Sequence, residues 1–68
     1  MEKALDNLIN RILKMNHSAE EWFALEKEVN DLLPKLPMEL EMKFTESGAG
    51  EALYMVCSGL RFEQSKND

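Results

Sequence analysis

Apolar residues recur every three or four positions along the first half of the chain. Within residues 1–15 they follow one helix face and cover about half of the helix circumference. Within residues 19–33 they form a narrower stripe, which is typical of a helix that packs on one neighbour. The residues that we expect in a shared interface between the two helices are Leu8, Ile12, Trp22, Leu25 and Val29.

Signals for helix ends separate these two helices. Ser18 followed by Glu21 has the spacing of a capping box, and His17 stands where a hydrophobic staple to Trp22 would form. Pro34 lacks an amide hydrogen, so the second helix should end just before it. Because the connection between the helices is short, the pattern predicts an antiparallel helical hairpin with the two stripes facing each other.

The hydrophobic period changes after Pro37. Residues 38–45 alternate between apolar and polar side chains, which predicts a β-strand, although glutamate, methionine, leucine and lysine are good helix formers. Residues 46–51 contain two glycines, and alanine is their largest apolar residue. This composition predicts a hairpin loop.

Two interpretations compete for residues 52–63. Tyr54, Val56, Leu60 and Phe62 would share one face of a strand. A helix would instead place Ala49, Ala52, Leu53, Val56 and Leu60 on one face. We favour the strand, since Gly59 lies inside the segment, Phe62 lies off the helical stripe, and several residues are poor helix formers, namely Tyr54, Val56, Cys57 and Phe62.

The sequence therefore predicts an α+β fold, in which an N-terminal antiparallel helical hairpin is followed by a two-stranded β-hairpin. The alternative is a small all-α bundle. Residues 1–63 would form a single small domain, and residues 64–68, which are small or polar, would form a disordered tail. Two separate domains are excluded, because 68 residues are too few for two cores.

Composition narrows the functional classes. The chain has 13 acidic and 8 basic residues, a net charge of −5, and the basic residues are scattered, so direct binding to nucleic acid is disfavoured. One cysteine and one histidine cannot supply a disulfide or a structural zinc site, and we expect neither a metal nor a cofactor. No apolar run is long enough to span a membrane. We therefore expect a cytoplasmic protein that does not act at a membrane.

The residues that could carry catalysis do not form a recognisable constellation. Cys57 and His17 are a thiol and a base, but each is alone in its segment. Ser47 to Gly50 lacks the lysine of a phosphate-binding loop. Glu39 and Glu41 would lie on the solvated face of a strand. The sequence thus predicts that the protein is not an enzyme.

An acidic ridge on the second helix is the best candidate surface for a protein partner. Carboxylates attract a basic partner over long distances, and a neighbouring aromatic residue can anchor it. We predict a small acidic regulatory protein that binds and inhibits or adapts another protein, with imitation of nucleic-acid phosphates as a special case. The alternative is a structural or assembly subunit that acts through homo-oligomerisation, and a homodimer is expected because so small a core needs support. The predicted partner-binding residues are Glu20, Glu21, Phe23, Glu28 and Asp31.

Overall fold

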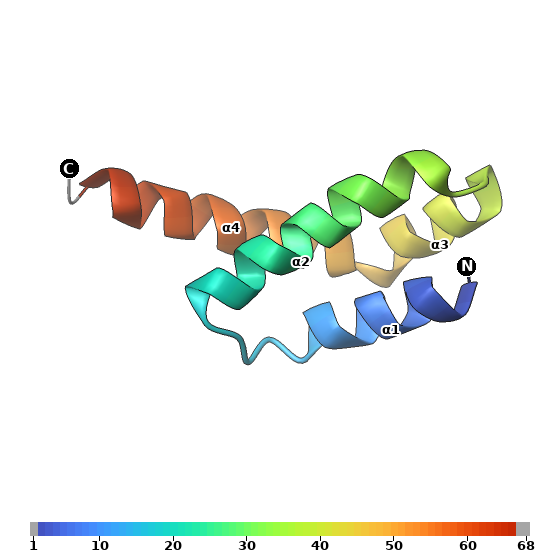
Figure 1. The fold of residues 1–68 in the computed structure, drawn as a ribbon, viewed down its shortest axis with the longest axis horizontal. Coiled ribbons are helices and arrows are strands. Elements are labelled where there is room, and N and C mark those ends of the chain that lie inside the picture. Colours follow the sequence, from blue (N-terminus) through green and yellow to red (C-terminus); the bar gives the residue numbers. More distant parts are fainter. Residues whose placement is uncertain (1, 67–68) are drawn as a thin grey trace.

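The computed structural model describes residues 2–66, and within them it contains four α-helices, one short 3₁₀ turn and no strand. The predicted α+β fold is therefore wrong, and the chain forms a small all-α bundle (Figure 1). The elements are α1 (Glu2–Leu13), α2 (Ala19–Leu32), the 3₁₀ turn η1 (Leu33–Lys35), α3 (Met38–Ser47) and α4 (Ala49–Lys66).

The first two helices form as predicted. The Ser18 hydroxyl caps α2 by accepting a hydrogen bond from the backbone N–H of Glu21 at 3.2 Å. His17 packs edge-on against Trp22, which is the predicted staple. After α2 the chain enters η1, where Pro34 stops the α-helical hydrogen-bonding pattern. In Figure 1, α1 runs from right to left and α2 returns from left to right above it, so the antiparallel hairpin is confirmed.

Residues 38–45 belong to α3, and the predicted strand is wrong. Leu40 and Phe44, four residues apart, turn toward the core, whereas Met38 and Met42, also four apart, lie exposed on another side of the helix. The apolar alternation thus consists of two helical pairs rather than one strand face. The strong helix propensity of these residues decides the structure.

A one-residue corner replaces the predicted hairpin loop. Gly48 takes the left-handed conformation with φ of 78°, which ends α3, and α4 begins at Ala49. The Ser47 hydroxyl accepts a hydrogen bond from the backbone N–H of Ala49 at 3.2 Å. The glycine that was interpreted as part of a loop is therefore a helix stop, and the next helix follows at once.

Residues 52–63 lie inside α4, so the strand prediction for them is also wrong. Leu53 and Cys57 are buried, and Val56 and Leu60 pack beside them. The helical alternative had placed Leu53, Val56 and Leu60 on one face, and the structure agrees with it. Gly59 is tolerated because it lies on the exposed side of the helix. The helix continues through Lys66, three residues beyond the predicted end of the domain at residue 63, and residues 67–68 lie outside the described part.

One cluster of buried side chains joins the helices, and α4 packs against the other three. On the surface, Lys43 of α3 bridges to Asp6 of α1 at 2.9 Å and to Glu2 at 3.4 Å. All five residues expected in the α1–α2 interface are buried. The buried cluster contains Leu5, Leu8, Ile9, Ile12, Trp22, Leu25, Val29, Leu36, Phe44, Ala49, Leu53 and Cys57.

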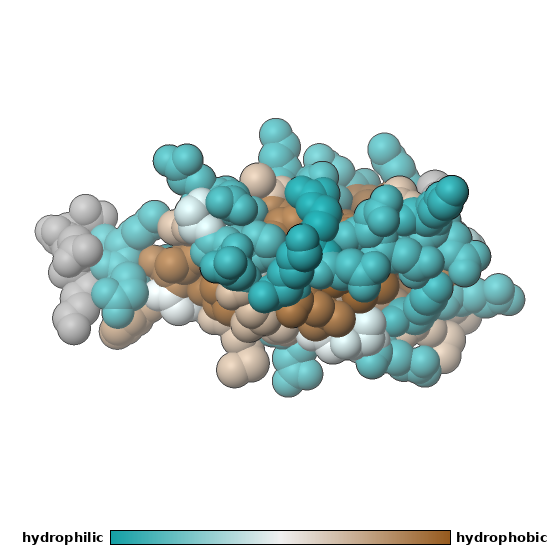
Figure 2. Space-filling model, turned by 90° about the horizontal axis from the view of Figure 1, so that it is seen from below, coloured by the Kyte–Doolittle hydropathy of each residue, from teal (hydrophilic) through white to brown (hydrophobic). Residues whose placement is uncertain are grey.

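The bundle leaves part of its apolar surface uncovered. Figure 2 shows apolar side chains along one long face of the molecule, between polar side chains on both rims. Within residues 2–66, none of the helices combines the length and the apolar composition that a bilayer span requires. The exposed large apolar side chains are Leu13, Met15, Met38, Met42, Tyr54, Met55 and Phe62.

Candidate functional site

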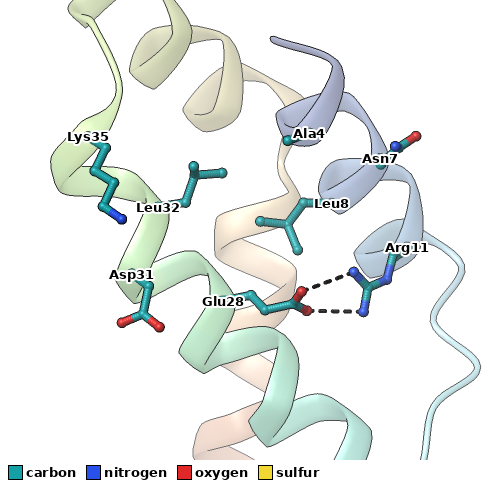
Figure 3. A pocket seen from close by; sticks show the side chains of 8 residues that line it. All are labelled: Ala4, Asn7, Leu8, Arg11, Glu28, Asp31, Leu32 and Lys35. Carbon is teal, nitrogen blue, oxygen red and sulfur yellow. Dashed lines mark hydrogen bonds and ion pairs between the residues drawn. The ribbon is translucent and has the colours of Figure 1, made fainter. Parts of the chain in front are cut away.

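An open groove of about 420 Å³ separates α1 from α2 on one side of the bundle (Figure 3). Leu8 and Leu32 supply apolar surface from the two helices. Charged side chains stand around them, which gives the groove an apolar floor and a polar rim, as is usual for sites that bind another molecule. The residues that line the groove are Ala4, Asn7, Leu8, Arg11, Glu28, Asp31, Leu32 and Lys35.

One end of the groove is closed by an ion pair between the two helices. The guanidinium of Arg11 contacts the carboxylate of Glu28 through two nitrogens, at 3.2 Å and 3.0 Å (Figure 3). Both side chains are about half exposed, so the pair contributes at most about 1 kcal/mol to stability. The larger effect of the ion pair is local. The positive charge of Arg11 compensates the negative charge of Glu28, and the two contacts fix the position of the Glu28 carboxylate.

The predicted acidic ridge is divided by such internal contacts. Glu28 is held by Arg11, whereas Asp31, one turn further along α2, is exposed on the rim of the groove. Glu20 and Glu21 lie at the other end of α2, in its first turn. The structure thus brings Glu28 and Asp31 together at the groove and places Glu20 and Glu21 away from it.

Glu21 is engaged by the residues that start α2. Its carboxylate lies 3.3 Å from Nδ1 of His17 and accepts a hydrogen bond from the Ser18 hydroxyl at 3.1 Å. These hydrogen bonds, with that to His17 the largest contribution, lower the pKa of Glu21 below its ordinary value. The Glu21 carboxylate is therefore held by the two residues that precede α2.

Phe23 lies on a different side of α2 from Glu28 and Asp31. Its ring is half-buried against the core, and the guanidinium of Arg61 from α4 covers it at 5.5 Å from the ring centroid. Arg61 also pairs with Glu26. Phe23 is therefore part of the packing between α2 and α4, and the structure does not join it to the charged residues of the groove.

Sequence reasoning missed the residues that α1 brings to the groove. Arg11 was treated as one of several scattered basic residues, and Leu8 as a core position only. The pattern of each helix was interpreted separately. The groove is lined by residues of both helices, so the pattern of one helix alone does not reveal it. Arg11 and Glu28 have opposite charges on neighbouring helices, which was the one available signal.

Cys57 and His17 do not form a nucleophile and base. The Cys57 thiol is buried and donates a weak hydrogen bond to the backbone carbonyl of Trp22, with sulfur and oxygen 3.7 Å apart. Burial raises the pKa of the thiol, which disfavours the reactive thiolate. The two ring nitrogens of His17 contact the carboxylate of Glu21 and the backbone carbonyl of Arg11. Neither side chain is placed to activate the other.

Within residues 2–66, no three potential metal-ligating side chains lie close enough together to hold an ion. Glu39 and Glu41, which were expected on one strand face, project from different sides of α3 because they are two residues apart in a helix. The groove brings two of the predicted partner-binding residues, Glu28 and Asp31, together beside apolar surface, and it is therefore the candidate site.

Comparisons with known proteins give no relative. No protein-family model, no curated protein and no solved structure matches this chain. Any statement about function therefore depends on the geometry and charge described above.

Proposed function

We propose that the protein is a small regulatory protein that binds a segment of another protein in the groove between α1 and α2, and so inhibits or adapts that partner. The observation that carries this proposal is the apolar floor of Leu8 and Leu32 beneath a charged rim. A groove between two helices can accept the apolar side of an amphipathic segment, which is a common way of recognising a peptide.

The charge of α2 indicates a basic partner. This helix carries five acidic residues and one basic residue, and the whole chain has a net charge of −5. Asp31 on the rim would meet a lysine or arginine of the bound segment, while the wider field speeds its approach. The proposed partner segment is therefore amphipathic, with an apolar residue for the floor and basic residues beside it.

The imitation of nucleic acid has less support from the geometry. Such a surface needs a continuous row of carboxylates, whereas Glu28 is paired with Arg11 and Glu21 contacts His17. A basic amphipathic segment needs only the groove and its rim. A binding protein for such a segment is the function that we propose.

Selection from two matched peptide libraries tests the proposal. Both libraries would present amphipathic helical peptides with randomised apolar positions, one with lysine and arginine on the polar side and the other with glutamate and aspartate. We expect binders from the basic library, with chemical-shift changes centred on Leu8 and Leu32 in NMR spectra of the labelled protein. Absence of binders from the basic library, or binders that map elsewhere, would contradict the proposal.

Variants that leave the core unchanged locate the binding. Ala4 is exposed on the groove, so Ala4→Arg should fill it and repel a basic peptide, weakening binding at least about tenfold. Asp31→Lys should slow association. Glu63→Lys on the exposed surface of α4 changes the net charge equally and is the matched control. Equal effects of Asp31→Lys and Glu63→Lys would mean that the rim has no specific role.

A further inference from the structure

The outward side of α4 is apolar and uncovered. Tyr54, Met55 and Phe62 are 72%, 65% and 68% exposed. Residues 61–65 are all exposed, and Figure 1 shows the C-terminal turns of α4 projecting beyond the other helices. Arg61 still contacts Phe23 and Glu26 of α2. A helical segment without such packing partners is only marginally stable in water, so a covering surface would stabilise the end of α4 beyond Arg61.

The exposed residues have a symmetric order along the helix. Tyr54, Ser58 and Phe62 are spaced by four residues and form one ridge, with a small residue in the middle and an aromatic residue at each end. Two such ridges that cross at Ser58 in opposite directions would place Tyr54 of one copy beside the partner's Phe62, and the reverse. The face is therefore complementary to itself under a two-fold rotation.

We propose that this face, defined by Tyr54, Met55, Ser58 and Phe62, binds a second copy of the chain and forms an antiparallel two-fold dimer with its axis at Ser58. The proposal concerns a surface separate from the α1–α2 groove and does not depend on the function proposed for that groove. Each copy would contribute the same residues, as a closed dimer requires.

The middle of the ridge permits the close approach that the dimer needs. Ser58 has a small side chain, and Gly59 beside it has none. A Cβ atom placed on Gly59 would have no atom within 4 Å, so the surface next to Ser58 is open. Helices that pack through their i, i+4 ridges come within about 8 to 10 Å of each other, and the aromatic side chains then fill the space on both sides of the crossing.

A second copy would remove the exposed apolar surface of Tyr54, Met55 and Phe62 from water on both chains at once, because each copy contributes the same side chains. Burial of apolar surface is the main favourable contribution to protein association.

The distribution of charge also favours a dimer interface on α4 over one on α2. Two chains with a net charge of −5 repel each other, so a dimer interface should avoid the acidic helices. Helix α4 carries two acidic and two basic residues, whereas α2 has an excess of four acidic residues. An antiparallel contact through α4 therefore brings two neutral helices together.

Sedimentation equilibrium of the full chain tests whether the dimer exists and where its interface lies. We expect a concentration-dependent shift from the monomer mass to twice that mass at micromolar concentrations. Ser58→Arg should weaken dimerisation at least about tenfold with unchanged helix content by circular dichroism. Thr45→Arg on the exposed side of α3 is the matched control and should leave the dimer intact. A wild-type monomer at all concentrations, or a dimer unaffected by Ser58→Arg, overturns the proposal.

Disulfide trapping tests the antiparallel arrangement. In a Cys57→Ala background that retains wild-type helix content, Ser58→Cys should give a covalent dimer on oxidation with copper phenanthroline in air, because the axis brings the two substituted positions together. Ser65→Cys, two turns away, should not, since its counterpart would lie at the other end of the interface. Trapping at both positions would mean a parallel dimer, and trapping at neither would mean a different interface; either result overturns the arrangement. Ala4→Arg in the groove should not change dimerisation, which separates this test from that of the groove.

Discussion

The imidazole of His17 meets the indole of Trp22 edge-on, with ring centroids 5.0 Å apart and an interplanar angle of 89°. Trp22 is buried, while its partner stands just before the first turn of α2. The contact therefore joins the α1–α2 connection to the core. His17 also contacts the backbone carbonyl of Arg11 and the carboxylate of Glu21, so one side chain links the end of α1 to the start of α2.

Replacing His17 by alanine should lower the free energy of unfolding by about 1 to 2 kcal/mol, because both the aromatic contact and the polar contacts are lost. Urea denaturation followed by circular dichroism measures this. Asn16→Ala, in the same connection and exposed, is the control and should change stability by less than about 0.5 kcal/mol. Equal effects of the two substitutions would mean that the staple does not stabilise the fold.

Stability should fall in acid partly because of Glu21. Its pKa in the folded chain lies below the ordinary value of 4.5, so the unfolded chain takes up the proton first as the pH falls. The contribution of Glu21 is complete above pH 4.5 and is lost as the pH falls through the lowered pKa of the folded state. Melting temperatures between pH 2 and pH 6 should therefore depend less on pH in Glu21→Gln than in the wild type. Glu20→Gln removes a neighbouring carboxylate outside these contacts and should retain the wild-type dependence.

The Cys57 thiol should react with Ellman's reagent only when the structure opens. Because burial raises its pKa, the folded chain holds the thiol proton more firmly than the unfolded chain does. The contribution of this group to stability is complete below pH 9.0, the ordinary value, and decreases as the pH rises above it. In Cys57→Ala this alkaline component should disappear. Fast modification of the native protein at neutral pH would show that the thiol is accessible.

Two glycines of α4 should respond in opposite directions to the same substitution. A Cβ atom on Gly50 would lie 2.7 Å from the ring of buried Phe44, so Gly50→Ala should destabilise the fold by about 1 to 3 kcal/mol. Gly59 faces open space, so Gly59→Ala should stabilise the helix by about 0.5 to 1 kcal/mol. Thermal unfolding at concentrations that favour the monomer measures both. A shift of the same sign in both variants would contradict the close packing of α3 on α4.

The sequence was sufficient to predict the first half of the fold because its signals are local and agree with one another. The spacing of Leu8, Ile12, Leu25 and Val29, the Ser18 cap and the stop at Pro34 all indicate the same two helices. Each of these signals acts within a few residues, so no knowledge of the rest of the chain was needed.

The second half was predicted wrongly because two signals disagreed. Alternation over residues 38–45 was given more weight than helix propensity, yet Met38 and Met42 are apolar residues that the fold leaves exposed. An exposed apolar residue imitates strand alternation when it stands between two core residues such as Leu40 and Phe44. A single glycine can likewise end a helix without a loop, as Gly48 does, and only tertiary packing distinguishes the two cases.

The candidate site was less accessible to sequence reasoning than the fold. Asp31 and Glu28 were found as charged positions of α2, but half of the groove lining comes from α1, which is far from them in the chain. Phe23 was predicted as a partner-binding anchor from the pattern of α2 alone, and its contact with Arg61 could not be foreseen because α4 was expected to be a strand. Charge can be read along one helix, whereas a concave surface requires the arrangement of two.

The projecting end of α4 has a consequence for amide hydrogen exchange. Residues 62–65 lie beyond the contacts of Arg61 with Phe23 and Glu26 and have exposed side chains, so their backbone hydrogen bonds can open by local fraying without unfolding of the core around Leu53. Their amides should exchange with solvent deuterium much earlier than those near Leu53. A molecule that binds firmly to the outer side of α4 must suppress this fraying. Slower exchange of these few amides therefore shows that the end of the helix is covered.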